Sequence, residues 1–87
     1  MSRFNEVLEP FMALMESELQ ANTAKGDRPA WLQMTPEQCL LEIYYHVSKL
    51  QKAVRDSDRA RVAENTADVA NMAMMMADIC GLLEPKP

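Results

Sequence analysis

A helix, a three-residue turn and a second helix follow one another between Thr35 and Leu83, and this order restricts the chain to a helical fold. Thr35-Pro36-Glu37-Gln38 predicts the start of the first of these helices, with Thr35 as N-cap, proline at the first position and Gln38 closing a capping box. Apolar residues then recur at spacings of three and four to about Arg55, namely Leu40, Ile43, Val47, Leu50 and Val54. Asp56-Ser57-Asp58 supplies a turn and the next N-cap, which predicts an antiparallel helical hairpin.

The second helix of the hairpin, expected over Arg59–Leu83, is apolar on two faces. One face carries Val62, Thr66, Val69, Ala73, Met76 and Leu83, and the other carries Ala63, Ala67, Ala70, Met74 and Ala77. A single antiparallel partner cannot cover both faces. We therefore expect a homodimer or higher oligomer, in which the two hairpin helices of each subunit, helices two and three of the protomer, form a four-helix bundle with those of a symmetry mate.

An earlier helix is predicted from about Arg3 to Asn22, because Phe4, Val7, Leu8, Phe11, Met15 and Leu19 share one face. With the hairpin, this helix gives an all-α, three-helix protomer. At 87 residues the chain is expected to form one domain over residues 1–87. No linker, repeat or low-complexity segment divides it.

Charge and composition exclude several function classes. The net charge of −4 argues against binding to a nucleic-acid backbone, which requires a basic face. The longest apolar run, Met72–Ala77, is too short for a bilayer, which takes about 20 residues. Cys39 and Cys80 stand alone without the spacing of a zinc site, and no signal-peptide pattern is present. A cytoplasmic protein without membrane or nucleic-acid partners is expected.

Each helix of the hairpin carries a line of polar side chains. Glu64, Asp68, Asn71 and Asp78 share one line, and Glu42, His46 and Lys49 share another. In a tight hairpin, the numbers of facing residues sum to about 114. His46 then lies level with Asp68, Lys49 with Glu64 or Asn65, and Glu42 with Asn71. This register predicts a polar cleft, or alternatively structural ion pairs between His46 and Asp68 and between Lys49 and Glu64.

The same hairpin resembles the all-α nucleoside triphosphate pyrophosphohydrolases of the MazG-like family. Residues 46–53 fit the family's E-x-x-E-L-x-x-A element in its apolar frame, and residues 65–71 fit E-x-x-D-V-x-N. The loop Lys25-Gly-Asp-Arg-Pro-Ala-Trp31 is similar to a loop in small members of the family. The resemblance extends from about Phe11 to Leu83.

The resemblance implies a magnesium site at His46, Lys49, Asn65 and Asp68, where the family has four carboxylates that act in cleavage of a triphosphate. Only Asp68 is acidic here, and Lys49 would place an ammonium group where the metal should lie. The leading hypothesis is therefore a decayed site without metal, cofactor or assigned catalytic residue. Such a protein would be a nucleotide-binding or protein-binding homo-oligomer with little or no hydrolase activity.

The family loop also implies nucleotide recognition. Lys25 and Arg28 would contact phosphates and Trp31 would stack on a base, with Lys49 and Asn71 completing the binding set. The competing interpretation is structural. In that case Arg28 pairs with an acidic neighbour, and Trp31 fills the core.

Two other functions stay open. An active pyrophosphohydrolase could use Mg²⁺ held by a shifted set of ligands drawn from Glu42, Glu64, Asp68 and Asp78 together with His46, with Glu64 and Asp68 the residual metal candidates. Alternatively, the chain is a purely structural interaction module. Its polar lines would then fix the helix register, and its surface would bind a macromolecule.

Overall fold

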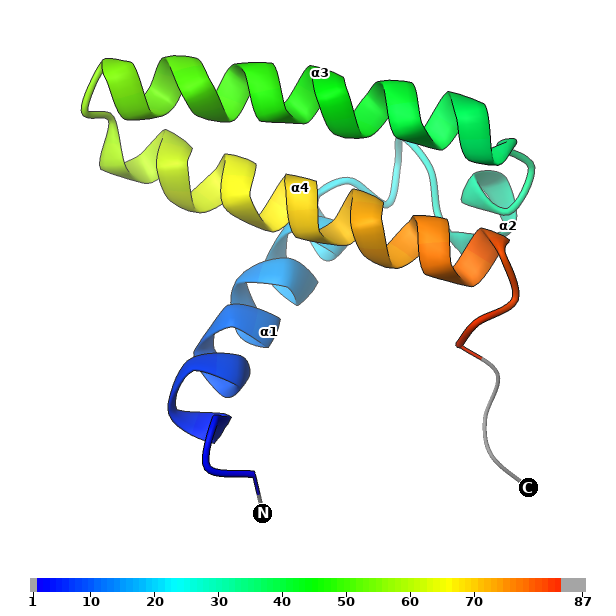
Figure 1. Ribbon diagram of the computed structural model, residues 1–87, viewed down its shortest axis with the longest axis horizontal. Helices are drawn as coiled ribbons and strands as arrows, with labels where there is room; N and C mark the ends of the chain where they lie inside the picture. The colour runs from blue at the N-terminus through cyan, green and yellow to red at the C-terminus, as the bar shows by residue number, and fades with distance from the viewer. Residues whose placement is uncertain (1, 84–87) are drawn as a thin grey trace.

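The protein is all-helical, as predicted. A computed structural model describes residues 2–83. It contains α1 (Asn5–Ala21), α2 (Arg28–Trp31), α3 (Pro36–Arg55) and α4 (Arg59–Ile79) (Figure 1). The sequence predicted three helices and did not predict α2, a single turn within the segment that resembles the family loop. Asp27 caps this turn by accepting a hydrogen bond from the Arg28 N–H, and Pro29 suits the early helical position it occupies.

The predicted hairpin is formed by α3 and α4, which lie antiparallel and side by side (Figure 1). Its capping box is present in full. The Thr35 hydroxyl accepts from the Gln38 N–H at 3.1 Å, and the Gln38 side chain accepts from the Thr35 N–H at 2.9 Å. After the turn, the Asp58 carboxylate accepts from the Arg61 N–H at 3.1 Å and caps α4. The local sequence therefore determines both helix starts.

The end of α4 differs from the prediction, because the helix stops at Ile79 rather than continuing to Leu83. Gly81 adopts a φ of 72°, a left-handed conformation that side chains disfavour. The Gly81 N–H donates to the Asp78 carbonyl, and the Leu82 N–H donates to the Ala77 carbonyl. These two bonds make a Schellman motif that satisfies the last carbonyls of the helix.

The interior of the hairpin is small. Cys39 and Ala53 of α3 and Ala67 and Met72 of α4 are buried, and the Cys39 thiol lies 3.4 Å from the Met72 carbonyl oxygen. From the predicted apolar stripe of α3, Ile43 and Leu50 are half-buried, whereas Leu40, Val47 and Val54 are exposed. The stripe is therefore rotated partly away from α4, and α3 keeps an apolar outer face.

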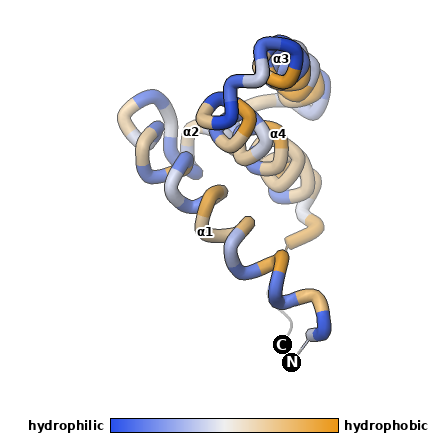
Figure 2. Tube along the Cα trace, turned by 90° about the vertical axis from the view of Figure 1, so that its left-hand side faces the viewer, coloured by the Kyte–Doolittle hydropathy of each residue, from blue (hydrophilic) through white to orange (hydrophobic). Residues whose placement is uncertain are grey.

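The first helix leaves the hairpin at a steep angle and packs mainly on α4 (Figure 1). It runs through Pro10, and none of its residues is buried. The Asn71 side chain donates a hydrogen bond of 2.9 Å to the Met15 carbonyl, which ties α4 to the middle of α1. Figure 2 shows apolar segments on α1 and along much of α4. None of the helices within residues 2–83 has the length and apolar character needed to cross a membrane.

Candidate functional site

A cavity of about 500 Å³ lies where α1, α3 and α4 meet the segment between α1 and α3. Most of the predicted site residues line it: Lys25, Trp31, Glu42, His46, Lys49, Glu64, Asp68 and Asn71. Arg28 and Asn65 are not among its lining residues. The fold therefore gathers polar side chains from the loop and from both helices of the hairpin.

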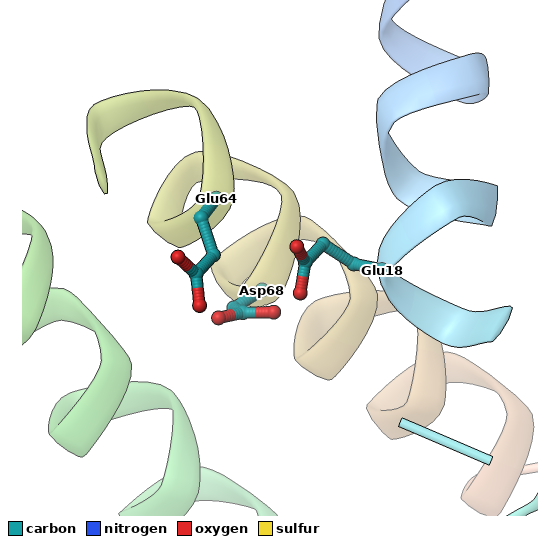
Figure 3. Close-up of side chains that lie close together, drawn as sticks. All are labelled: Glu18, Glu64 and Asp68. Carbon is teal, nitrogen blue, oxygen red and sulfur yellow. The ribbon is translucent and has the colours of Figure 1, made fainter. Parts of the chain in front are cut away.

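Three carboxylates converge at this cavity (Figure 3). Glu18 reaches from α1 toward Glu64 and Asp68 on α4, and one oxygen of each lies within 4.8 Å of the others. Burial raises the pKa of Glu18, and the nearby carboxylates of Asp68 and Glu64 raise it further. The cluster therefore concentrates negative charge where a cation or proton is favoured.

The prediction that His46 and Asp68 lie at the same height on the two facing helices is confirmed by their distance. His46 Nδ1 lies 3.9 Å from an Asp68 oxygen, and His46 Nε2 lies 4.0 Å from a Glu42 oxygen. Both distances are longer than a hydrogen bond. Nδ1 is buried without a hydrogen-bond partner.

Lys49 does not neutralise the carboxylates. Its ammonium nitrogen lies 5.4 Å from the centre of the Tyr45 ring, in a cation–π arrangement on the same helix. Among the described residues, the ion pairs do not include one between Lys49 and either Glu64 or Asp68. The predicted Lys49–Glu64 pair is therefore not formed, although both side chains border the same cavity.

Arg28 and Trp31 are held by one residue, Asp78, near the end of α4. Two Arg28 nitrogens donate to the two Asp78 oxygens at 2.8 and 2.9 Å, and the Trp31 indole N–H donates at 2.9 Å. The Arg28 and Trp31 hydrogen bonds lower the pKa of Asp78 to about 2. Arg28 therefore has the acidic partner of the structural interpretation, whereas Trp31 also borders the cavity.

Two buried asparagines on α4 lie close to the carboxylates. Asn65 and Asn71 are each only 4% exposed, and the side-chain oxygen of each is without a hydrogen-bond partner. Asn71 lines the main cavity. Asn65 lines a second cavity of about 310 Å³, together with Lys49, Lys52, Ala53, Arg61 and Glu64. Both asparagines were predicted site residues, and the structure places Asn71 at the main cavity and Asn65 at the second cavity.

Sequence analysis missed Glu18, the carboxylate that α1 contributes. The position of Glu18 beside the carboxylates of α4 depends on tertiary packing, because the loop that joins α1 to the hairpin does not fix the register between them. A signal was nevertheless present: Glu18, Asn22 and Lys25 follow the spacing i, i+4 and i+7, and all three line the cavity. A polar line at the end of α1 and in the turn that follows it is consistent with a polar environment there.

No protein-family model matches the chain, and no curated protein and no solved structure shows significant similarity to it.

Proposed function

We propose that the chain is a MazG-like protein that binds a nucleotide together with a divalent cation in the main cavity. The observation that carries the proposal is the convergence of Glu18, Glu64 and Asp68 in a cavity also lined by Lys25 and Lys49. Carboxylates and ammonium groups in one cavity suit a ligand that combines a metal ion with phosphates.

The three carboxylates fit a small divalent cation. Mg²⁺ prefers hard oxygen ligands at about 2.1 Å, so adjacent ligands in its octahedral shell are about 3 Å apart and opposite ones about 4.2 Å. The oxygens of the cluster lie within 4.8 Å of one another, so the side chains would have to draw closer together to hold one cation. Glu18 thereby replaces part of the acidity that this chain lacks at His46, Lys49 and Asn65, where the family has carboxylates. A bound cation would neutralise phosphate charge and polarise phosphate oxygens.

The remaining lining residues suit the other parts of a nucleotide. Lys25 and Lys49 are donors for phosphate oxygens, and Lys49 can leave the exposed Tyr45 ring at small cost. The Trp31 indole N–H is occupied by Asp78, which fixes the ring orientation. A base can then stack on a ring that is already immobilised, so less conformational entropy is lost on binding.

A second candidate function is hydrolysis of a nucleoside triphosphate to a monophosphate and pyrophosphate. Glu18 favours it, because a three-carboxylate cluster retains the ligand type that the reaction uses. His46 also borders the cavity, with Nδ1 3.9 Å from an Asp68 oxygen, and it is the lining residue of the type that most often acts as a general base.

Calorimetric titration with Mg²⁺ and a panel of nucleoside triphosphates tests the binding proposal. We expect Glu18→Gln to weaken cation binding at least tenfold, which corresponds to about 1.4 kcal/mol. Glu16→Gln is the matched control, because Glu16 is exposed on the same helix and is absent from the cavity lining. Equal affinities for both variants and the wild type would exclude Glu18 as a ligand.

A pyrophosphate-release assay on the same proteins separates the two functions. Nucleotide binding without release supports a binding protein, whereas release that Asp68→Ala or Glu64→Ala abolishes supports the hydrolase. If no nucleotide or cation binds, a purely structural interaction module becomes the better explanation. In that case the Arg28–Asp78–Trp31 contacts would serve only to fix the loop on α4.

The proposal includes association of two copies into a four-helix bundle. Along the outer face of α3, Leu40, Tyr44, Val47 and Val54 are between 43% and 63% exposed, and they follow the spacing i, i+4, i+7 and i+14. This is the spacing of a seam between packed helices. A second copy of the chain can cover this stripe and supply the interior that the single hairpin lacks.

A further inference from the structure

His46 is the one histidine of the chain, and it borders the main cavity among carboxylates. Its Nδ1 lies 3.9 Å from an Asp68 oxygen, and its Nε2 lies 4.0 Å from a Glu42 oxygen. Asp68 is in turn a member of the carboxylate cluster with Glu18 and Glu64. The imidazole therefore adjoins the proposed cation site on the Asp68 side.

The surroundings of the two ring nitrogens indicate which one carries the lone pair. A histidine that binds a metal through one nitrogen usually directs the N–H of the other at a carboxylate, a carbonyl or water. Glu42 lies on the Nε2 side and its side chain is 52% exposed, so Nε2 has a carboxylate and solvent to donate to. With its proton on Nε2, His46 presents Nδ1 as an acceptor beside the Asp68 carboxylate, which is itself an acceptor. A cation between the two stabilises both.

The gap between His46 Nδ1 and Asp68 suits a metal ion that sheds its water. Bonds from Zn²⁺ to imidazole nitrogen and carboxylate oxygen are about 2.0–2.2 Å, so two ligand atoms of one ion are about 3 to 4.2 Å apart. The observed 3.9 Å falls in this range and is too long for a hydrogen bond. Nδ1 is also buried, without a partner in residues 2–83. An ion bound there must exchange water for protein ligands, which Mg²⁺ does reluctantly.

A second buried acceptor borders the same cavity. Asn71, three residues after Asp68 on α4, is 4% exposed. Its NH₂ group donates to the Met15 carbonyl at 2.9 Å, which sets the orientation of the amide, and its oxygen has no partner in residues 2–83. A buried acceptor without a donor is unfavourable, and a nearby cation reduces that cost. Asn71 therefore favours positive charge in the cavity independently of the carboxylates and the imidazole.

We propose that the cation site of the main cavity prefers a first-row transition metal ion such as Zn²⁺ to Mg²⁺, because His46 Nδ1 binds the ion together with Asp68 and the other two carboxylates of the cluster. The inference rests on the proposed function and names its cation. Carboxylates alone suit Mg²⁺, whereas imidazole suits Zn²⁺ and its neighbours in the first transition row. His46 stands where the family resemblance implies a carboxylate, so the nitrogen ligand distinguishes this chain. With its lone pair on the ion, Nδ1 would not serve as the base of the hydrolase alternative.

The test compares the wild type with His46→Gln, His46→Glu and the control Cys80→Ser. Glutamine removes the imidazole, and glutamate supplies the carboxylate that the family has at this position. Cys80 is an exposed free thiol outside the cavity lining, and thiols bind Zn²⁺ on their own. The probes are Zn²⁺ alone and Mg²⁺ alone. Calorimetry measures each affinity, and NMR follows the ring protons of His46 in the wild type, so one readout is independent of how well a variant folds.

We expect the ratio of Zn²⁺ affinity to Mg²⁺ affinity to fall about tenfold or more in both His46 variants and to be unchanged in Cys80→Ser. The His46 ring protons should shift as Zn²⁺ binds. An unchanged ratio in both His46 variants, with unshifted ring protons, would overturn the inference and leave a cation held by carboxylates alone, as in the proposed function. Loss of Zn²⁺ binding in Cys80→Ser would assign the ion to the thiol and also overturn the inference. Failure of the wild type to bind either cation would overturn the inference and the proposed function together.

Discussion

At the scale of single residues, Asp78 decides the roles of two residues that the sequence left ambiguous. Its carboxylate is 11% exposed and accepts hydrogen bonds from both Arg28 and Trp31. Neither contact could be predicted from spacing, because 50 and 47 residues separate the partners and a loop lies between them. The sequence supplied the residue types for this contact, but the packing of the loop on α4 supplied the partner.

Stability should depend on pH through Asp78. Its folded-state pKa of about 2 lies below the ordinary value of 3.8, so its contribution is fully present above pH 3.8 and is lost as the pH falls toward 2. We expect Asp78→Asn to lower the free energy of unfolding at neutral pH, and the difference from wild type to shrink across this interval. Urea titrations at a series of pH values measure it.

The fluorescence of Trp31, the one tryptophan in the chain, reports the same contact locally. We expect Asp78→Asn to change the emission spectrum at neutral pH, whereas Glu9→Gln on exposed α1 should not. A constant stability difference between Asp78→Asn and wild type from neutral pH to pH 2 would show that the carboxylate charge does not hold the loop.

At the scale of elements, sequence predicted helix starts and hairpin register better than helix faces. The start of α3 depends on local hydrogen bonds of Thr35 and Gln38, and the short turn fixes His46 level with Asp68. The face that α3 turns toward α4 depends instead on close packing. Small residues such as Cys39 and Ala53 allow the helices to approach, so the larger Leu40 and Val47 lie outside.

The end of α4 gives a prediction about an element boundary. Gly81→Ala should destabilise the protein by about 1–2 kcal/mol, because a Cβ disfavours the left-handed conformation that ends the helix. No heavy atom lies within 4 Å of a Cβ built at Gly81, so the cost is conformational rather than steric. Thermal unfolding followed by circular dichroism should show a melting temperature lower by about 4–8 °C per kcal/mol.

Gly26→Ala is the matched control for that boundary. Gly26 is not among the residues with positive φ in residues 2–83, and a Cβ there would lie 3.8 Å from the Ala30 Cβ, an ordinary contact. We expect this variant to be neutral or slightly more stable than wild type, because alanine restricts the unfolded chain. Equal losses at both glycines would mean that the Schellman motif does not limit stability.

At the scale of the whole molecule, one copy of the chain exposes more surface than a compact protein of its mass. Its accessible surface is 6758 Å², whereas a folded monomer of 9.9 kDa exposes about 5,200 Å². The excess of about 1,600 Å² is of the order that one partner buries in a large, permanent interface. The buried apolar residues are Cys39, Ala53, Ala67 and Met72, a small interior for residues 2–83. Both observations favour a partner that covers the exposed helix faces.

Val47→Asp tests whether that partner is a second copy. Val47 lies within the outer stripe of α3 and is 43% exposed, so a charge there is tolerated in a monomer but unfavourable in an apolar helix–helix seam. We expect wild type to sediment as a dimer or higher oligomer, and Val47→Asp to dissociate and melt at a lower temperature. Gln33→Asp adds the same charge at an exposed position just after α2 and should leave the assembly intact. A monomeric wild type, with Val47→Asp equally stable, would mean that the stripe is not a seam between copies and that the hairpin is stable without one.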